Sequence, residues 1–476
     1  MTKLAKISPI GLIMILLSGI FSCQSGGLPE KPNVLFIAVD DLRPELNCYG
    51  RSQIKSPNID ALAAEGLLFQ QAYCNIPVCG ASRASLMTGL RPTFNRFINY
   101  YTWAEKDAPG IKTLPGLFRY HGYHTISNGK VFHHRTDSKE SWDEIWYPEA
   151  RATWRDYQLP ENILLDTLSG RDQRGPAWEC VEGPDSIYFD GRIALKSIRD
   201  LKKLKAEDKP FFLATGFLKP HLPFNATKKY WDMYDPEKIV IPSNDTLPLG
   251  LPYHMISNWG ELRSYDAIPA EGPVTDSAAR KLIHGYYACV SSTDAAIGIL
   301  LDELKALDLE RSTIVILWGD HGWNLNEHGM WCKHCNFNTS LRSTLMLKVP
   351  GKTKGRQTEA LVEFIDIYPT LAELCNLPLP VHLEGKSMVP LVMNPEADFK
   401  DHIISKWYDG LTIQTDQYAY TEWFDRKDSL MGTMLFDHRN DRDENFNLAM
   451  LPEHKGLVDS LSQVMHASKG KDYYKE

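Results

Sequence analysis

The sequence lacks three features: a surplus of positive charge, a second long apolar run and a regular set of cysteines. Acidic residues outnumber basic ones, 60 to 52, so the formal net charge is −8 at pH 7. An acidic surface argues against a nucleic-acid partner. It also repels polyanions, so an anionic substrate would need a local basic pocket. After the first apolar run, no stretch is apolar enough to cross a membrane.

The cysteines show no spacing typical of a disulfide framework. There are 9 in 476 residues. Cys332 and Cys335 form a CxxC motif, but no second CxxC completes a zinc site. This disfavours a zinc or redox role, and we expect a pair of structural thiols or a local disulfide.

The N-terminus has the pattern of an export signal. Lys3 and Lys6 precede an apolar run from Ile10 to Phe21, which is too short for a membrane-spanning helix. Cys23 follows, as in a bacterial lipoprotein. We therefore predict a signal peptide at residues 1–22 and export to the periplasm or outer membrane of a Gram-negative bacterium. The only membrane contact would be a lipid on Cys23, and a plain cleaved signal is the alternative.

Three apolar runs end in polar residues. They are Asn33–Val39 before Asp40 and Asp41, Phe211–Thr215 before Lys219 and His221, and Thr313–Leu317 before Asp320 and His321. Continuous apolar runs are typical of strands covered on both faces. Segments with helical spacing, such as Ser277 to Leu307, separate them. We therefore predict an α/β fold with a large, mostly parallel sheet sandwiched by helices, and polar residues at the carboxyl ends of its strands.

The last part of the chain has a different pattern. Its closely spaced strand candidates are Ile403–Trp407, Leu411–Thr415, Tyr418–Trp423 and Met434–Asp437, followed by a helix near Leu457–Val464. They predict a small α+β unit with an antiparallel sheet. We place a catalytic domain at residues 28–395 and a C-terminal subdomain at residues 396–476. The tryptophan-rich segment from His134 to Cys180 is irregular, as insertions that carry specificity often are.

The strongest motif is Cys79-Gly-Ala-Ser-Arg83, continued by Thr88-Gly-Leu-Arg-Pro92. A cysteine before a helix is weak evidence alone, and a buried structural thiol is the plain alternative. The whole string, however, resembles the signature of the formylglycine-dependent type I sulfatases of the alkaline phosphatase superfamily. Further blocks resemble the iduronate-2-sulfatase-like branch of that family, including Asn33–Pro44, Lys219–Phe224, Gly319–Trp323 and Asp437–Asn445.

This resemblance implies an alkaline phosphatase-like fold and a sulfuric ester hydrolase. In that family a formylglycine-generating or anaerobic sulfatase-maturating enzyme oxidises the signature cysteine, here Cys79, to formylglycine. The hydrated aldehyde carries two hydroxyls on one carbon. One attacks sulfur, and deprotonation of the other releases sulfate again.

The resemblance and the residue types together predict a metal site. Asp40, Asp41 and Asp320 are carboxylates at strand ends, which suit one hard cation such as Ca²⁺. His321 and the oxidised side chain of Cys79 would complete it. Imidazole is an unusual calcium ligand, so Mg²⁺, Mn²⁺ and Zn²⁺ stay open. A helix-capping pair is the other interpretation of Asp40 and Asp41.

By the same resemblance, basic residues neutralise the sulfate. Arg83, Lys130 and His133 would hold the formylglycine hydrate, and His221 and Lys333 would face the sulfate. We assign His221 as general acid and His133 as base. Each could be a solvated surface group alone, and His334 competes with Lys333. Substrate contacts are expected from residues that could equally be packing residues, namely Asn99, Tyr101, Trp103, Trp323 and His334.

The predicted function is hydrolysis of sulfate esters on a carbohydrate. The substrate would be a sulfated oligo- or polysaccharide that contains uronate, either iduronate 2-sulfate-like or of the algal ulvan type. The alternative is a phosphodiesterase or phosphonate monoester hydrolase of the same superfamily. A glycan-binding lipoprotein with a decayed site is a third hypothesis.

Overall fold

The structure is a computed structural model that describes residues 28–150, 153–168, 174–207, 209–251, 255–257, 259–425, 427 and 429–468. The predicted signal peptide and Cys23 lie outside the described residues. No described helix is both long and apolar enough to span a bilayer.

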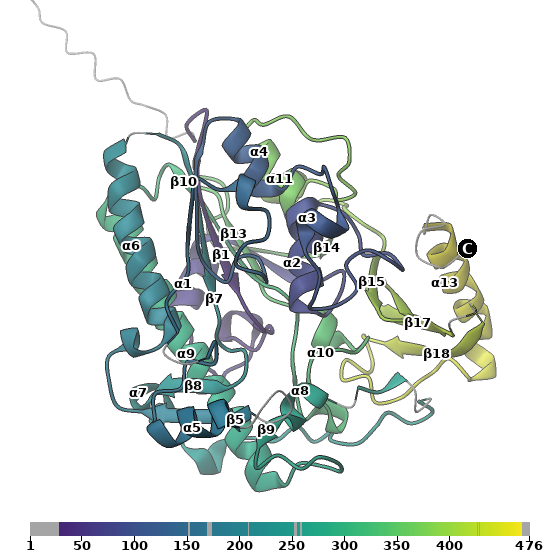
Figure 1. Cartoon of the computed structure of the whole chain (residues 1–476). Coiled ribbons are helices and arrows are strands. Elements are labelled where there is room, and N and C mark those ends of the chain that lie inside the picture. The colour runs from purple at the N-terminus through teal and green to yellow at the C-terminus, as the bar shows by residue number, and fades with distance from the viewer. Residues whose placement is uncertain are drawn as a thin grey trace, which may run out of the picture.

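A sheet of eight strands forms the centre of the molecule (Figure 1). In spatial order the strands are β14 (Arg356–Glu363), β2 (Leu67–Tyr73), β13 (Leu345–Lys348), β10 (Thr313–Gly319), β1 (Asn33–Val39), β7 (Phe211–Phe217), β3 (His124–Gly129) and β4 (Glu144–Trp146). Only β13 runs antiparallel to its neighbours β10 and β2. The predicted mostly parallel sheet is confirmed.

Helices cover both faces of the sheet. On one face lie α1 (Pro57–Glu65), α6 (Phe189–Glu207) and α9 (Asp276–Ala306), and on the other lie α2 (Cys79–Thr88), α4 (Leu114–Tyr120) and α11 (Ile367–Leu374). Alternate residues of β1 point to opposite faces. Leu35 and Ile37 join the α6–α9 core, whereas Val34 and Phe36 join the α2–α4–α11 core. Burial on both faces explains why β1 is continuously apolar.

Short elements lie at the carboxyl ends of the parallel strands. They are α3 (Ala104–Asp107), α5 (Pro160–Leu168), β5 (Arg174–Pro176), β6 (Trp178–Val181), β8 (Phe224–Thr227), α7 (Lys228–Trp231), α8 (Gly260–Arg263), β9 (Tyr265–Asp266), β11 (Asn324–Leu325), β12 (Trp331–Cys332) and α10 (Asn338–Leu341). The pairs β5–β9 and β6–β8 join the segment 134–180 to later parts of the chain.

An antiparallel sheet follows α12 (Val389–Met393), as predicted. Its strands are β15 (Ile403–Trp407), β16 (Gly410–Gln414), β17 (Tyr418–Phe424) and β18 (Leu430–Asp437), covered by α13 (Lys455–Ser468). The sheet is bonded to the segment before α2: Lys406 N donates to Asn75 O (2.8 Å), and Ser405 Oγ to Cys74 O (2.6 Å). The boundary near residue 396 stays a prediction; it falls between α12 and β15.

Candidate active site

Three carboxylates meet where β1 and β10 end. The parallel pairing places Val39 opposite Gly319, so Asp40 and Asp41 lie beside Asp320. All three are fully buried. The backbone N–H of Asp41 donates to Oδ1 of Asp320 (3.0 Å). The left-handed backbone of Asp41 (φ 61°) turns the chain at this point.

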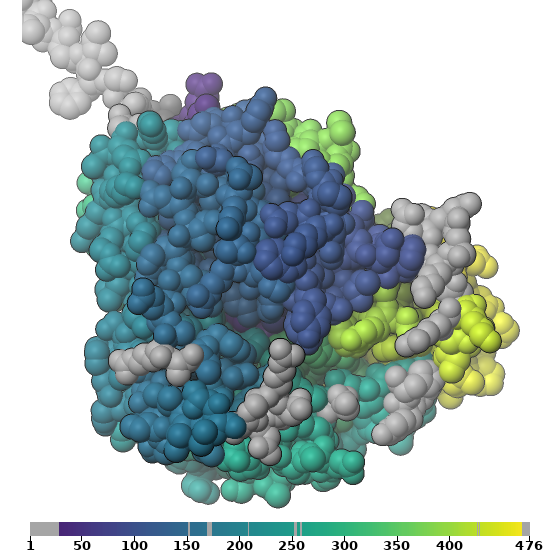
Figure 2. Space-filling view, viewed as in Figure 1, coloured from purple at the N-terminus to yellow at the C-terminus, as the bar shows by residue number. Residues whose placement is uncertain are grey.

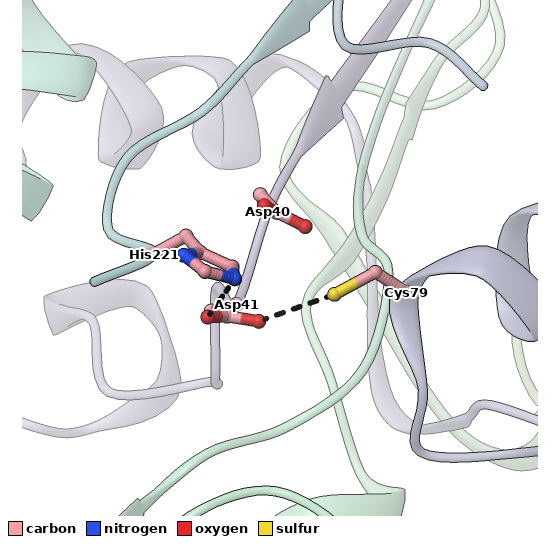
Figure 3. Close-up of side chains that lie close together, drawn as sticks. All are labelled: Asp40, Asp41, Cys79 and His221. Atoms are coloured by element: carbon pink, nitrogen blue, oxygen red, sulfur yellow. Dashed lines mark hydrogen bonds and ion pairs between the residues drawn. The ribbon is translucent and has the colours of Figure 1, made fainter. Parts of the chain in front are cut away.

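Cys79 begins α2, and its side chain points at Asp41 (Figure 3). Its Sγ lies 3.2 Å from Nε2 of His321 and 3.8 Å from Oδ1 of Asp41. Burial and Asp40 raise the pKa of the thiol well above its usual value. Gly80 lets the chain at Tyr100 pack on the first turn of α2, because a Cβ there would lie 2.8 Å from Tyr100 O.

Arg83 is buried behind the carboxylates. Its Nε donates to Oδ2 of Asp320 (2.9 Å) and its Nη2 to Oδ1 of Asp40 (3.2 Å), and Nη1 contacts the carbonyls of Lys130 and Val131. The Lys130 ammonium contacts the other oxygen of Asp40. Burial raises the pKa of Asp40, but Lys130, His221 and Arg83 outweigh it and hold that pKa well below its usual range. Arg83 therefore orients the carboxylates.

The donor atoms fit a hard divalent cation. Asp40, Asp41, Cys79 and His221 offer ligand atoms within 4.8 Å of one another, as do Cys79, Asp320 and His321. Nδ1 of His321 donates to the carbonyl of Gly322 (2.9 Å), so Nε2 is the ring nitrogen that faces Cys79 and Asp41. Burial raises the pKa of Asp41 to about 7, despite Lys333. The basic residues nearby compensate the charge of the carboxylates only in part. Such a group of carboxylates is a typical cation site.

Glu261 lies between His221 and Lys333. Its Oε1 is 3.0 Å from Nε2 of His221, and its Oε2 is 2.8 Å from Nζ of Lys333. Nζ of Lys333 also lies 3.3 Å from both carboxylate oxygens of Asp41. Burial raises the pKa of Glu261, but Lys333 and His221 hold it well below its usual range. Sequence reasoning missed Glu261, because α8 stands in an irregular segment without a motif.

The ring of His221 has a fixed orientation. Its Nδ1 donates to the carbonyl of Leu222 (2.6 Å), so Nε2 is the nitrogen that faces the site, 3.9 Å from Oδ2 of Asp41. Burial and Lys333 lower the pKa of His221, while Glu261 opposes that change. The rings of Trp154 and His221 form a T-shaped pair, with centroids 5.5 Å apart. Trp154 comes from the tryptophan-rich insertion and was not among the predicted site residues.

His133 follows β3 on the same loop as Lys130. The ring is half-buried, and its Nδ1 is covered without a hydrogen-bond partner. Burial and Lys130 lower the pKa of His133 well below its usual value, so the ring is neutral. A neutral imidazole can accept a proton, and the role of base for His133 stays a prediction.

The predicted substrate contacts after α2 lie at the surface beside the site. Tyr101 is 67% exposed, its hydroxyl lies 2.7 Å from that of Tyr100, and Oδ1 of Asn99 accepts from its backbone N–H (2.8 Å). Trp103 stacks on His134, with centroids 4.4 Å apart. In Figure 2 this dark-blue segment and the green-teal segment that contains α8 and β9 lie on the same face of the molecule. Tyr101 is free to contact a ligand, whereas Trp103 already packs on a neighbour.

The other two predicted contacts pack against neighbouring side chains, Trp323 fully buried and His334 half-buried. Trp323 is 1% exposed and lies under Lys333, whose Nζ is 4.8 Å from the ring centroid. A sugar has no access to its face. His334 stacks on Trp407 of β15, with centroids 4.9 Å apart. This stack brings the C-terminal sheet against the loop that carries Lys333.

The CxxC motif is a pair of structural thiols. Every cysteine in the described ranges is a free thiol, so no local disulfide joins Cys332 and Cys335. The Sγ of Cys335 lies 3.0 Å from Oγ of Ser340. Both cysteines are buried.

The fold and the site together define an α/β protein with a mostly parallel central sheet and a buried carboxylate cluster at its strand ends. The family model for sulfatases matches residues 32–377, and the model for the C-terminal part of N-sulphoglucosamine sulphohydrolase matches residues 326–471. The chain belongs to the sulfatase family and is a sulfuric ester hydrolase.

Known proteins of similar sequence are also sulfatases. Iduronate 2-sulfatase of Mus musculus is 34% identical over 75% of this chain and 71% of its own length. An ulvan-active sulfatase of Formosa agariphila is 28% identical over 99% of this chain and 90% of its own length.

Solved structures share the fold. One holds its substrate D-glucosamine-2-N,6-O-disulfate; it has a TM-score of 0.75 at 20% identity and covers 94% of this chain and all of its own. A phosphonate monoester hydrolase of Agrobacterium radiobacter has a TM-score of 0.74 at 21% identity, over 92% of this chain and 95% of its own.

Proposed function

We propose that this sulfatase hydrolyses sulfate esters of uronate-containing oligosaccharides, iduronate 2-sulfate-like or of the ulvan type. The reaction would use a formylglycine made from Cys79 and one Ca²⁺. The observation that carries the proposal is the position of Cys79. It lies against His321 and Asp41 on one side of a buried site whose other side is Lys333 and His221. The names of the iduronate- and ulvan-acting relatives support the substrate class.

The donor set supports the two groups that complete the site. Asp40, Asp41, Asp320 and His321 would hold the cation together with residue 79. When bound, the cation would neutralise sulfate charge, and the formylglycine would supply a hydrated aldehyde as nucleophile. Ca²⁺ is the choice because three of the donors are carboxylates.

The other roles follow from side-chain positions. Lys333 would bind a sulfate oxygen, because its ammonium lies 3.3 Å from both carboxylate oxygens of Asp41 at the site and is held there by Glu261 on its other side. His221 would donate a proton from Nε2 to the alcohol oxygen as the S–O bond breaks, since Nδ1 is held by Leu222. His133, which is neutral, would be the base of the release step and would accept the proton of the hydroxyl that remains on residue 79.

The proposal is tested by sulfate release from a panel of defined sulfated oligosaccharides. Wild-type protein should release sulfate from 2-O-sulfated uronates, and Cys79→Ala should release none. Mass spectrometry of the Cys79 peptide should show formylglycine in protein made with a maturating enzyme. Sulfate release by Cys79→Ala at the wild-type rate would contradict the nucleophile.

A second candidate function is phosphonate monoester hydrolysis. It is favoured by the shared fold of the Agrobacterium radiobacter enzyme. Matched aryl sulfate and aryl phosphonate esters separate the two. The sulfatase proposal predicts the higher kcat/KM for the sulfate.

The cellular location is also a proposal, motivated by Lys3, Lys6 and the apolar run before Cys23. The mature protein would be an exported lipoprotein. Metabolic lipid labelling should mark the wild type and leave Cys23→Ala unlabelled. Absence of label on the wild type, with the leader removed, would indicate a plain cleaved signal instead.

A further inference from the structure

We propose that Arg174 and Trp154 form a subsite for a second anionic group on the sulfated sugar, a carboxylate or a second sulfate. The inference rests on the proposed function and narrows its substrate class to sugars with two negative groups. Both residues come from the insertion between residues 134 and 180, and no part of the sulfatase chemistry described above uses them.

Arg174 is a half-buried cation without a carboxylate partner. Its Nε and Nη1 are covered and make no hydrogen bond, and no ion pair to this arginine occurs in the described ranges. Two other arginines do have carboxylate partners: Arg155 of the insertion pairs with Asp166, and Arg192 of α6 pairs with Asp156. A covered guanidinium is costly unless it is paired. A bound anion would supply the missing partner, and the planar fork suits a carboxylate or a sulfate.

The fold places Arg174 beside the active site. Its strand β5 pairs with β9, and its guanidinium lies 5.1 Å from the ring centroid of Tyr265. β9 directly follows α8, which holds Glu261 between His221 and Lys333, and these elements lie together in Figure 1. The buried hydroxyl of Tyr265 interacts with this guanidinium, which leaves Nε and Nη1 of Arg174 without an anionic partner. Tyr265 and Glu261 raise the pKa of Arg174 despite its burial, so the group is a permanent cation.

Trp154 supplies an apolar surface at the same place. Its side chain is 39% exposed although its ring packs against that of His221. An exposed ring next to the proposed general acid is placed to contact the sugar that carries the scissile ester. Asp166 connects Trp154 with Arg174. It accepts a hydrogen bond from Nη1 of Arg155 (2.9 Å), and the Arg155 guanidinium lies over the Trp154 ring. It also accepts a hydrogen bond from the backbone N–H of Gly175, the residue after Arg174 (3.1 Å). One carboxylate therefore positions the aromatic ring and the cation together.

The experiment measures binding and turnover separately. Binding is measured calorimetrically on Cys79→Ala protein, which does not turn over, so this arm is independent of the proposed reaction. Three probes are used: a 2-O-sulfated uronate disaccharide, its carboxyl-reduced counterpart and a glucosamine disulfate. Adding Arg174→Gln should weaken the affinity for the 2-O-sulfated uronate disaccharide about ten- to hundredfold. The affinity for its carboxyl-reduced counterpart should change less than about twofold. Arg174→Lys should restore part of the affinity, and the exposed Arg199→Gln on α6 should change nothing.

The third probe identifies the anion. A loss for the uronate alone assigns the subsite to a carboxylate, and an equal loss for the disulfate assigns it to any second anion. Equal loss for all three probes, or none, overturns the proposal, as does undetectable binding of every probe. In active protein, Arg174→Gln should raise KM for the uronate and leave kcat/KM for an aryl sulfate unchanged. Absence of turnover by the wild type refutes the proposed function. The binding measurements still test the anion subsite, because they do not depend on turnover.

Discussion

Oε1 of Glu261 lies 3.0 Å from Nε2 of His221, so the ring nitrogen that faces the active site has an anionic partner. That carboxylate favours the protonated ring, the form that a general acid needs. The relation gives Glu261 a positioning role that its place outside every recognised motif did not suggest.

Glu261→Gln should lower kcat about tenfold, because the protonated form of His221 loses its stabilising charge. Since that charge raises the pKa of His221, its removal should move the alkaline limb of the kcat profile to lower pH. The exposed Glu182→Gln is the matched control. An unchanged pH profile with lower kcat would mean that Glu261 acts only by packing.

Gly80→Ala should lower the free energy of unfolding by about 1–3 kcal/mol, because its Cβ would lie 2.8 Å from the carbonyl oxygen of Tyr100. Gly456→Ala, in α13, meets no atom within 4 Å and should be neutral or stabilising by up to about 1 kcal/mol. Chemical denaturation compares the two. Equal values would show that Tyr100 does not pack on α2.

Chelation should lower the Tm of wild-type protein, and added Ca²⁺ should restore it, because a cation offsets the buried charge of Asp40, Asp41 and Asp320. Asp40→Asn should abolish most of this response. Calorimetry with Ca²⁺ and Mg²⁺ in turn ranks the two ions. A Tm indifferent to chelator and to either ion would contradict a metal at these carboxylates.

Stability should fall on acidification partly through His334. Burial and Lys333 lower the pKa of this ring from 6.5 to about 3, so the unfolded chain binds a proton that the folded chain refuses. Its contribution is fully present above pH 6.5 and is lost progressively as pH falls toward 3. His334→Phe keeps a ring against Trp407 and should flatten the fall in Tm between pH 6.5 and pH 4. An unchanged slope would refute this assignment.

The sequence predicted the parts of the site that belong to a continuous sequence pattern, such as an apolar strand or a motif. β1 occupies the predicted residues. Its register with β10 brings Asp40 and Asp41 beside Asp320, because the carboxyl ends of parallel strands meet at the same edge of a sheet. The signature string placed Cys79 at a helix start. The C-terminal strands were found because each is short, β-rich and bounded by turns.

Other parts carry no local signal. Glu261 reaches the site from a four-residue helix, and Trp154 from an irregular loop, so only the folded chain brings them to His221. Trp323 and His334 were expected at the sugar because they follow the metal motif, but both pack on neighbours. Aromatic composition alone does not separate a binding face from a packing face.

The hydrogen bonds from Lys406 and Ser405 to Asn75 and Cys74 limit how the gene can be trimmed. A chain ended before β15 would leave those two carbonyls without partners, a few residues ahead of the nucleophile, and would uncover the ring of His334. A deletion designed to isolate the catalytic domain would therefore disturb the segment that leads into Cys79. Split or truncated versions have to keep this strand, whatever they discard after it.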